Sequence, residues 1–502
     1  MALVHHTNCD ATHEFQIVEI TLNCHAMDTT SQRAALIAEL ETIVGQNHVL
    51  KDDDVSSRAQ HFWNAAPRVA LAIVRPANTQ EVSEVLALCH KARQCVVTHG
   101  GLTGLVDGDR TDETDLVLSL ERMRTIESLD PAGKTLSVQA GCVLEQVQLA
   151  AQSVDLSFGL DLGARGSCTI GGNLATNAGG LSVLRFGMAR EQVLGLEVVL
   201  MDGTVLSSMN ALLKNNAGHD LKHLFIGSEG TLGVITRAVL RLRPKTLSCN
   251  TAMMACDNFS QVSQLLNYLE RELMGQLNAF EVLWKPVVEL NTNGQLDGAV
   301  TAPFDLTSKL YVITEARGAN PDKDEKQFES VISGALEAGW VRDGVIAQSE
   351  QERKNLWTIR ENIELMLAHK PHYVFDISLP IGSMESYIDD LEDALNARWP
   401  STKLFSYGHV ADSNLHLIIA PSQSENPTRA ELDAQYEQVN RLVFEPLSAL
   451  GGSISAEHGI GLSKKAWLRY SRTDAEIQVM QSLKRLFDPN ELLNRGRIVD
   501  AC

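Results

Sequence analysis

Residues 161–203 read DLGARGSCTIGGNLATNAGGLSVLRFGMAREQVLGLEVVLMDG, and this stretch decides the fold expected for the rest of the chain. Its centre, Thr169 to Gly180, has four glycines in twelve positions, and most other residues there are small. Glycine costs backbone entropy on folding, so a run of it is kept where the chain turns at positive φ or approaches a ligand closely. The Ser, Thr and Asn side chains in between supply hydrogen-bond donors and acceptors without bulk. The stretch therefore predicts a surface for a flat cofactor with polar edges, with a ligand-free loop rich in Gly and Asn as the alternative.

Two more glycine-rich turns also suit close approach of the backbone to a ligand. An apolar strand (Val69–Val74), an amphipathic helix (Thr79–Ala92) and a second strand (Cys95–Thr98) lead into His99–Gly108, which reads HGGLTGLVDG. Successive backbone N–H groups in such a loop can point at phosphate oxygens. The loop matches neither the GxGxxG dinucleotide fingerprint nor the P-loop pattern. The third turn, Ile226–Thr236 (IGSEGTLGVIT), again joins glycines to a strand, and three such turns are hard to explain as ordinary loops.

The composition is that of a globular chain with a strong acidic excess. At 502 residues, with 44% hydrophobic and 21% charged residues, two or three domains are expected. The net charge of −20 argues against nucleic acid or an anionic membrane as a partner. Nine cysteines, an odd number without a CxxC pair, indicate reduced thiols rather than a disulfide framework. No run of about eighteen apolar residues exists, so no transmembrane helix is expected.

Residues 1–29 form an N-terminal extension to which the sequence gives no role. They lack the basic segment and apolar core of a secretory signal, and they contain no Lys or Arg. Because basic residues are missing there, a cytoplasmic location is predicted ahead of the mitochondrial matrix.

The pattern changes after Pro244. Short apolar strands alternate there with longer helical segments, which predicts a second domain of α/β or α+β type that carries the substrate site. The expected strands are Thr251–Ala255, Ala279–Trp284 and Lys309–Thr314, and the expected helices are Asn258–Leu273 and Asp324–Ala338.

Two short motifs in the second half carry chemistry. Tyr407–His416 (YGHVADSNLH) has two histidines seven positions apart, and its Gly and its Asp-Ser-Asn run favour a strand–turn–strand. Ser455–Gly461 (SAEHGIG) adds an adjacent Glu and His. Two histidines and one glutamate with an open position are a common catalytic zinc arrangement. A purely structural histidine pair is the alternative.

Together, His99–Gly108, Gln139–Cys142, residues 161–203 and Ile226–Thr236 resemble the flavin domain of the vanillyl-alcohol-oxidase-type FAD superfamily. Within that superfamily the sequence resembles the branch of D-2-hydroxyglutarate and D-lactate dehydrogenases, from about Pro67 to the end. The resemblance implies an α+β fold whose FAD-binding domain has two subdomains. After the extension (1–29), the implied parts are the FAD-binding domain (30–245), an α/β substrate domain (246–455) and a C-terminal segment that returns to the FAD domain (456–502).

The resemblance also implies which residues hold FAD. The pyrophosphate loop would consist of Gly100, Gly101, Leu102, Thr103, Gly104, Leu105 and Val106. The pyrophosphate and isoalloxazine would also contact Ser167, Thr169, Gly172, Asn173, Thr176, Asn177 and Gly180. The adenosine half would face Glu229, Gly233 and Ile235, and Asn494 would return to the flavin. A covalent flavin link at His99 is not expected in this branch.

The resemblance assigns roles in catalysis as well. His409, His416 and Glu457 match the ligands of a divalent metal, most readily zinc, and His458 matches the general base. A metal on the substrate hydroxyl lowers its pKa, a neutral imidazole takes the proton, and the flavin accepts the hydride. Arg360 matches the arginine that binds the substrate carboxylate, for which its forked donors are suited. The alternative for Arg360 is a helix-surface residue paired with Glu364 at i,i+4.

Three substrate-pocket positions depart from the hydroxyglutarate pattern. Glu364, Val374 and Ile418 stand where hydroxyglutarate-type members can have Thr, Lys and Asn. Each of these differences removes a hydrogen-bond donor from the substrate pocket or makes the pocket more apolar or more acidic. Motif similarity along the chain therefore favours D-2-hydroxyglutarate, whereas these positions favour D-lactate or another D-2-hydroxy acid with an apolar tail.

The expected function is thus an FAD-dependent, metal-assisted dehydrogenase of D-2-hydroxy acids. A non-redox flavoprotein of the same superfamily and a flavin-binding scaffold are the alternatives. The expected partners are a small 2-hydroxy acid, an electron acceptor such as an electron-transfer flavoprotein or a quinone, and a second copy of the chain in a homodimer.

Overall fold

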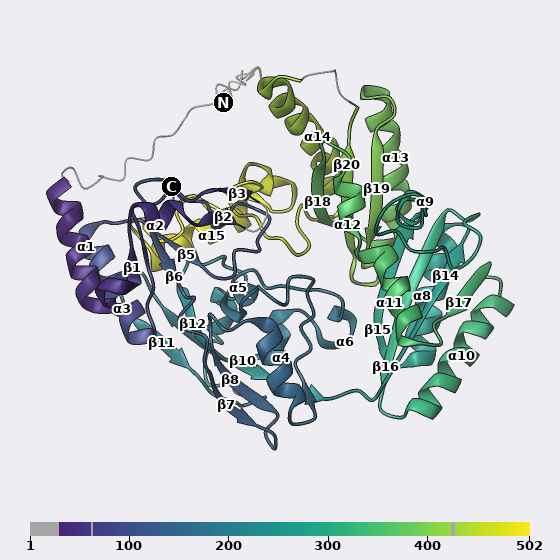
Figure 1. The fold of residues 1–502 in the computed structure, drawn as a ribbon, viewed down its shortest axis with the longest axis horizontal. Coiled ribbons are helices and arrows are strands. Elements are labelled where there is room, and N and C mark those ends of the chain that lie inside the picture. Colours follow the sequence, from purple (N-terminus) through teal and green to yellow (C-terminus); the bar gives the residue numbers. More distant parts are fainter. Residues whose placement is uncertain (1–29, 62–63, 423–426, 502) are drawn as a thin grey trace, which may run out of the picture.

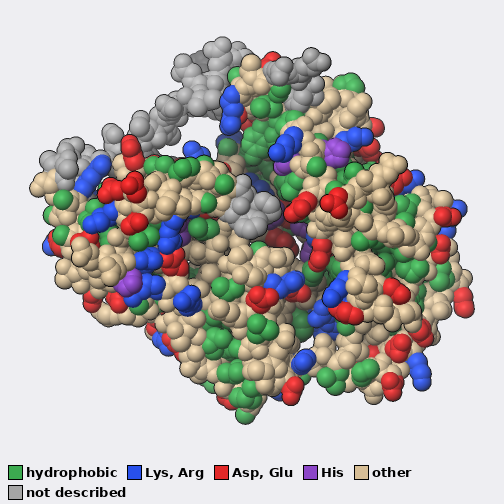
Figure 2. Space-filling view, in the orientation of Figure 1, with side chains coloured by type: hydrophobic (Ala, Val, Ile, Leu, Met, Phe, Trp, Pro, Cys, Tyr) green, Lys and Arg blue, Asp and Glu red, His purple; other side chains and the backbone are tan. Residues whose placement is uncertain are grey.

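The computed structural model describes residues 30–61, 64–422 and 427–501, which form two domains side by side (Figure 1). The first domain carries the chain from α1 (Thr30–Val44) to β13 (Arg243–Pro244) and also receives the C-terminal helix α15 (Asp474–Phe487). The second domain extends from β14 (Ser248–Cys256) to α14 (Arg429–Leu450). In Figure 2, acidic and basic side chains are interspersed over the visible face, so the acidic excess does not gather into one patch there.

The first domain contains two main sheets in two subdomains. One has the order β1-β4-β6-β5 and is parallel except at the β1 edge, and the other has the antiparallel order β11-β10-β12-β8-β7. Their strands are β1 (Val49–Leu50), β4 (Ala72–Val74), β5 (Val96–His99), β6 (Leu116–Ser119), β7 (Ile126–Asp130), β8 (Thr135–Gln139), β10 (Val193–Val199), β11 (Val205–Ser208) and β12 (Val234–Arg241). The smaller strands are β2 (Ala59–His61), β3 (Asn64–Pro67) and β9 (Leu156–Ser157). The remaining helices are α2 (Asp53–Ser56), α3 (Thr79–Ala92), α4 (Leu144–Gln152), α5 (Ile170–Ala175), α6 (Val183–Phe186) and α7 (Lys222–Phe225).

Helix α3 shows how the sequence sets these elements. Asn78 is its N-cap, and the Asn78 side chain accepts the backbone N–H of Glu81. Val82, Val85 and Leu86 recur at helical spacing and are fully buried. They belong to one hydrophobic core that both sheets of this domain share. That core fixes the loop after β5 relative to α5.

The second domain is built on a seven-stranded sheet in the order β17-β14-β16-β15-β19-β20-β18. All of its neighbouring strands are antiparallel, so the domain has α+β connectivity. Its other strands are β15 (Leu277–Trp284), β16 (Leu310–Gly318), β17 (Asp343–Ile346), β18 (Tyr373–Ser378), β19 (Lys403–Gly408) and β20 (Asn414–Ala420). One face packs on α8 (Phe259–Leu273), α10 (Pro321–Glu337), α13 (Met384–Arg398) and α14. The other face packs in part on α9 (Lys285–Asn291), α11 (Glu350–Glu361) and α12 (Ile363–Leu367).

The C-terminal segment packs on the first domain. Val96 in β5 donates its N–H to Leu492 and accepts the N–H of Asn494, so this segment extends the parallel sheet beyond β5. In α15, Lys484 Nζ donates to Asp488 Oδ2 at 2.7 Å and to the carbonyl of Leu493 at 2.7 Å. Within the described residues, no helix combines the length and apolar character that a bilayer span needs.

The Lys484–Asp488 pair provides a test of this docking. Its side chains are 3% and 0% exposed, and loss of one partner of a buried pair costs about 3–5 kcal/mol. We expect Lys484→Met to lower the unfolding temperature clearly, as measured by calorimetry. Lys285→Met is the control, because Lys285 lies in an exposed pair with Glu289. Equal unfolding temperatures for the two variants would contradict this role of Lys484.

Candidate active site

The second sheet gathers polar side chains on one face. Strands β15, β19, β20 and β18 are neighbours, and every second residue along each strand lies on the same face. Tyr407 lies opposite His416, and His416 lies opposite Asp376. Glu281 lies two residues before Leu283, which is the partner of Tyr407. The four polar residues therefore share the face that α8, α10, α13 and α14 do not cover.

Arg360 and His409 meet at a buried carboxylate, Glu281. Arg360, at the end of α11, donates from Nε to Glu281 Oε2 at 2.9 Å, and its Nη2 lies 2.9 Å from His409 Nε2. Burial alone would raise the pKa of Glu281, but His409 and Arg360 hold it below its ordinary value. Burial alone would lower the pKa of Arg360, but Glu281 raises it. The guanidinium therefore stays charged, and it lies over the Tyr407 ring at 5.1 Å from the centroid.

A second buried carboxylate holds the loop 456–461, which carries both residues of the predicted Glu-His motif. Asp376 Oδ2 accepts three successive backbone N–H groups, those of residues 456–458, at 3.1, 2.7 and 3.0 Å. Burial alone would raise the pKa of Asp376, but His458, Lys464 and these hydrogen bonds hold it below its ordinary value. Asp376 thus fixes the start of the loop as a carboxylate.

The end of the loop is held from the first domain. The two carboxylate oxygens of Glu229 accept the N–H groups of Ile460 and Gly461 at 2.7 and 2.8 Å. Burial raises the pKa of Glu229, although both hydrogen bonds act against this shift. The buried ammonium of Lys464 interacts electrostatically with both Asp376 and Glu229. The loop is therefore held by one carboxylate from each domain.

Three side chains lie close enough to hold a metal ion together. Donor atoms of Asp376, His416 and Glu457 lie within 4.8 Å of one another. His409, the other predicted ligand, has its ring centroid 5.4 Å from that of His416. The pKa of His416 is lowered well below its ordinary value by burial and by Arg360, which leaves the neutral imidazole that metals require. Imidazole and carboxylate donors of this kind fit a divalent ion such as zinc.

Glu457 also joins the loop to the glycine-rich stretch. Its Oε1 accepts the backbone N–H of Gly180 at 2.9 Å. Gly180 has a φ of +106°, and a Cβ at this position would collide with the carbonyl oxygen of Asp161. Only glycine accommodates both constraints. The predicted metal ligand and the predicted flavin stretch are therefore in direct contact.

The residues predicted to hold FAD gather around α5 and the loop after β5. A Cβ on Gly100 would lie 2.7 Å from Thr169 Oγ1, and one on Gly101 would collide with the backbone of Ser167. The two glycine-rich segments thus pack backbone to backbone. The buried hydroxyls of Thr169 and Thr98 have no hydrogen-bond partner among the described residues. Orphaned polar atoms beside such a cradle fit a polar ligand such as the FAD pyrophosphate.

Four predicted cofactor residues have a left-handed backbone. Leu102, Asn177, Glu229 and Asn494 have φ values of 56°, 52°, 50° and 44°, a region that residues with a Cβ seldom adopt. Such residues cluster at ligand sites, because the surrounding structure must over-determine them. Asn494 is held on both sides: its Nδ2 donates to the Glu229 carbonyl at 2.7 Å, and its Oδ1 accepts the N–H of Thr98 at 2.8 Å.

The remaining predicted cofactor residues divide between loops and core. The loop after β5 continues through Thr103, Gly104, Leu105 and Val106, and the region of α5 contains Gly172, Asn173 and Thr176. Gly233 and Ile235 instead lie inside the core of the first domain. Ile235 is 5% exposed, and a Cβ on Gly233 would lie 2.6 Å from the Val198 side chain.

Val374 and Ile418 lie one step along the sheet from the polar cluster. They are opposite each other, two residues from Asp376 and His416 respectively, and on the same face. Val374 is 47% exposed, whereas Ile418 is 1% exposed and packs in the cluster of Phe405. The structure therefore brings both predicted pocket residues beside the candidate site.

Glu364 lies apart from Arg360. Helix α11 ends at Glu361, and Glu364 belongs to α12 after a break at Asn362. The carboxylate partner of Arg360 is Glu281, 79 residues away in the chain. The i,i+4 alternative for Arg360 is therefore not what the structure shows.

His99, at the start of the glycine loop, is turned into the protein. It is 3% exposed, and its Nε2 lies 2.9 Å from the Asp109 carbonyl and 3.3 Å from Arg68 Nη1. Burial, followed by the charge of Arg68, lowers the pKa of His99 to about 3. The imidazole is therefore neutral at physiological pH.

Sequence analysis missed Asp376 and Glu281 as members of the site. Each is the one acidic residue in a mostly apolar strand, YVFDIS in β18 and LNAFEVLW in β15. An unpaired carboxylate is too costly to bury, so an acid inside an apolar strand signals a partner elsewhere. That signal was present, but it does not identify the partner.

Two family models match the chain and together cover both domains. The model described as "FAD binding domain" matches residues 70–208, and "FAD linked oxidases, C-terminal domain" matches residues 248–498. The chain belongs to the FAD-linked oxidase family. The expectation of an FAD-dependent oxidoreductase is thereby confirmed.

Two relatives with assigned names are similar in sequence to this chain over most of its length. A protein of rice (subspecies japonica), named probable mitochondrial D-2-hydroxyglutarate dehydrogenase, is 36% identical over 92% of this chain and 81% of its own. D-2-hydroxyglutarate dehydrogenase of Xanthomonas citri pv. viticola is 38% identical over 87% of this chain and 90% of its own.

Solved structures share the fold at low sequence identity. p-Cresol methylhydroxylase with substrate bound has a TM-score of 0.72 at 14% identity, covering 94% of this chain and 98% of its own. Alkyldihydroxyacetonephosphate synthase has a TM-score of 0.69 at 17% identity, covering 92% and 86%.

Removal of the Asp376 charge tests the loop anchor. We expect Asp376→Asn to retain FAD but to lower turnover per flavin about 10–100-fold, the usual loss for a residue that orients metal ligands. Flavin absorbance and steady-state kinetics measure the two quantities. Asp389→Asn is the control, because Asp389 pairs with Lys309 at the surface. Turnover of Asp376→Asn equal to that of the control would contradict the anchoring role.

His99 predicts an acid-sensitive first domain. Its pKa falls from about 6.5 in the unfolded chain to about 3 in the fold. The stabilisation is complete above pH 6.5 and is lost as the pH falls toward 3, by about 2 kcal/mol at pH 5. When the pH falls from 7 to 5, we expect the free energy of unfolding of His99→Gln, measured in urea, to fall by about 2 kcal/mol less than that of wild type. The exposed His219→Gln should follow wild type, and the same pH slope in all three proteins would disprove the assignment.

Proposed function

We propose that the chain oxidises D-2-hydroxy acids to 2-oxo acids, with D-2-hydroxyglutarate as the first candidate substrate. The observation that carries the proposal is the hydrogen bond between Glu457 and Gly180, because it holds the loop with His458 against the stretch that fits FAD. Relatives named D-2-hydroxyglutarate dehydrogenase, 34% to 38% identical, support the substrate class.

The chemistry requires that a proton and a hydride leave the same substrate C–O–H unit. Bound FAD supplies the hydride acceptor. Burial lowers the pKa of His458, so its imidazole is neutral at physiological pH and can take the hydroxyl proton as general base. Arg360 binds the substrate carboxylate: its Nε donates to Glu281 and its Nη2 lies 2.9 Å from His409 Nε2, which leaves Nη1 to donate to the substrate.

We assign the divalent metal, zinc first, to His409, His416 and Glu457. When bound, the metal acts as a Lewis acid that lowers the pKa of the substrate hydroxyl. Asp376 is the weaker candidate ligand, because its Oδ1 already accepts a hydrogen bond from Asn414 and its Oδ2 accepts three from the loop. Its part in the proposal is to position the loop.

The side chains of Val374 and Ile418 form a wall beside the candidate site, and their chemistry affects which substrate tail can bind there. Val374 and Ile418 offer no hydrogen-bond donor, which favours D-lactate or an apolar-tailed acid as the second candidate. The second carboxylate of D-2-hydroxyglutarate needs a donor at this wall. His369 is one such group, because its ring lies 5.4 Å from Phe405, which is opposite Ile418.

The electron acceptor, assembly and location complete the proposal. An electron-transfer flavoprotein or a quinone would reoxidise the flavin, and the chain would act as a homodimer. The odd number of cysteines supports a reducing, cytoplasmic compartment. Relatives of rice and Arabidopsis thaliana are named mitochondrial, so the mitochondrial matrix is the alternative.

Anaerobic bleaching of the flavin absorption band tests the function. We expect D-2-hydroxyglutarate to bleach the band fastest in a panel of D- and L-2-hydroxy acids, and a chelator to slow the reaction. Arg360→Lys should lower the second-order rate of bleaching by roughly 100-fold, because it keeps the charge but removes the forked donors that bind the carboxylate. Arg342→Lys, at an exposed pair, is the control.

The other outcomes separate the alternatives. Fastest bleaching by D-lactate or an apolar-tailed acid would establish the second candidate. No bleaching by any acid would favour a non-redox flavoprotein. An unchanged rate in Arg360→Lys would remove this residue from the substrate site.

A further inference from the structure

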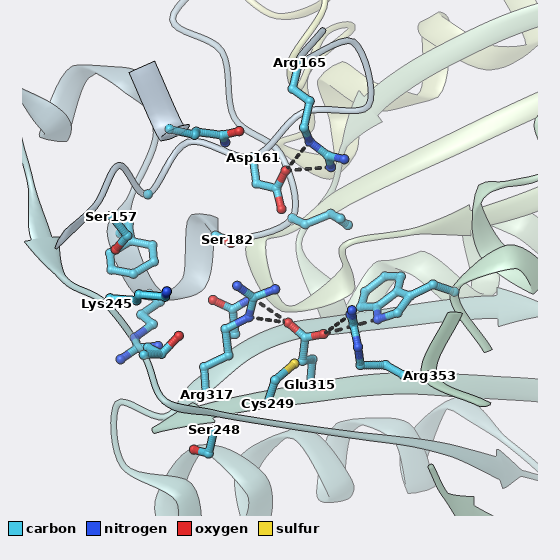
Figure 3. Close-up of a pocket in the computed structure, with 18 of the residues that line it drawn as sticks. Ser157, Asp161, Arg165, Ser182, Lys245, Ser248, Cys249, Glu315, Arg317 and Arg353 are labelled. Carbon is cyan, nitrogen blue, oxygen red and sulfur yellow. Dashed lines mark hydrogen bonds and ion pairs between the residues drawn. The ribbon is translucent and has the colours of Figure 1, made fainter. Parts of the chain in front are cut away.

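A separate polar cavity of about 770 Å³ lies between the two domains (Figure 3). Its lining comes from the first domain around Asp161 and α6, from the linker before β14, and from β16 and α11 of the second domain. None of the individual residues predicted to hold FAD, metal or substrate lines it, although six lining residues belong to the stretch 161–203 and Glu361 adjoins Arg360 in the chain. The cavity is therefore distinct from the candidate active site and adjacent to it.

The lining is positive in a chain that is strongly negative. Six of its residues are Arg or Lys, and four are Asp or Glu. The whole chain carries a net charge of −20. A local excess of cations in a concave site concentrates anions there, whatever the mean field.

Three of the four acids of the cavity already pair with a cation of its lining. Glu315, whose side chain is 2% exposed, accepts from Arg317 Nε at 2.6 Å and lies 3.6 Å from Arg353 Nη1 (Figure 3). Asp161 pairs with Arg165 at 2.7 Å. Since these carboxylates hold their own partners, they do not neutralise the remaining cations.

Two cations of the cavity lack an acid. Among the described residues, no carboxylate lies within 4.0 Å of Arg185 or Lys245, and Arg185 Nη1 is buried without a hydrogen-bond partner. Burial, and then the charge of Arg317, lowers the pKa of Arg185. The hydrogen bond from Arg317 to Glu315 uses Nε, which leaves its two Nη groups for another acceptor. Arg185 and Lys245 thus lie at the domain junction without an acidic partner among the described residues, whereas Arg317 shares its charge with Glu315.

We propose that this cavity binds a small dianion, a dicarboxylate or a phosphate, between Arg185, Lys245 and Arg317. Guanidinium forks match the paired oxygens of both groups. Arg185 belongs to the first domain and Arg317 to the second, so the bound anion joins the domains. The ligand neutralises positive charge that the fold leaves uncompensated, and it therefore stabilises the contact between the two domains.

Calorimetric titration of the oxidised FAD-loaded protein tests the site, with glutarate and inorganic phosphate as probes. Glutarate has no hydroxyl to oxidise, so turnover does not interfere. We expect saturable binding by wild type and roughly tenfold weaker binding by Arg185→Gln. Arg472→Gln, which removes an equal charge from an exposed pair outside the cavity, should bind as wild type does.

Arg360→Lys separates this site from the active site. We expect Arg360→Lys to bind phosphate as wild type does and to keep the cavity component of glutarate binding, since Arg360 does not line the cavity; only the glutarate bound at the active site should be lost. Tighter binding of glutarate would identify a dicarboxylate, and tighter binding of phosphate would identify a phosphate. Loss of binding in Arg360→Lys together with full binding in Arg185→Gln would overturn the proposal, as would absence of saturable binding.

A second variant, Lys245→Gln, tests the proposal independently in case Arg185→Gln does not fold. Lys245 is exposed, so Lys245→Gln should fold, and we expect it to weaken binding in the same direction. Trp357 lines the cavity and donates to Glu315 at 3.2 Å, so its fluorescence gives a local signal. The proposal would also be overturned if the fluorescence titration with the probe had the same midpoint in Lys245→Gln as in wild type.

Discussion

Five backbone N–H groups of one loop end on two buried carboxylates, and the candidate site depends on this arrangement. Asp376 accepts three of them and Glu229 accepts two. One carboxylate comes from each domain, so the loop 456–461 is fixed only where the domains meet. The positions of Glu457 and His458 therefore follow from domain packing rather than from a local helix or strand. Lys464 offsets charges that would otherwise destabilise the interior.

The same balance of charge governs the rest of the polar sheet face. Glu281 is buried in a strand without a solvent-exposed residue, and Arg360 and His409 stabilise its charge. Buried polar groups of this kind are stable only when nearly every member has a partner. In the candidate active site, side chains of the protein itself supply these partners. The cavity at the domain junction does not follow this rule, because Arg185 has no counter-charge there, and this contrast distinguishes the two regions.

Much of the fold could be predicted, because its patterns are local. The helix expected at Thr79–Ala92 has the same bounds in the structure, and that expected at Asp324–Ala338 begins earlier, at Pro321, because Asn320 caps it. The motifs also indicated His416 and Glu457, which the structure brings together. The contacts of Asp376 and Glu281 could not be predicted, because their partners lie 81 and 79 residues away, and only the packing of the loop 456–461 and of α11 on the sheet determines them.

The pairing of the C-terminal segment with β5 has a consequence for biosynthesis. Thr98 binds Asn494, which is added to the chain 396 residues later. At about 5–20 residues per second, the ribosome needs roughly 20–80 s to cover that distance. During that interval the nascent first domain lacks the edge that holds the glycine loop and Glu229. The glycine loop and Glu229 therefore reach their final arrangement only after the last residues have been synthesised.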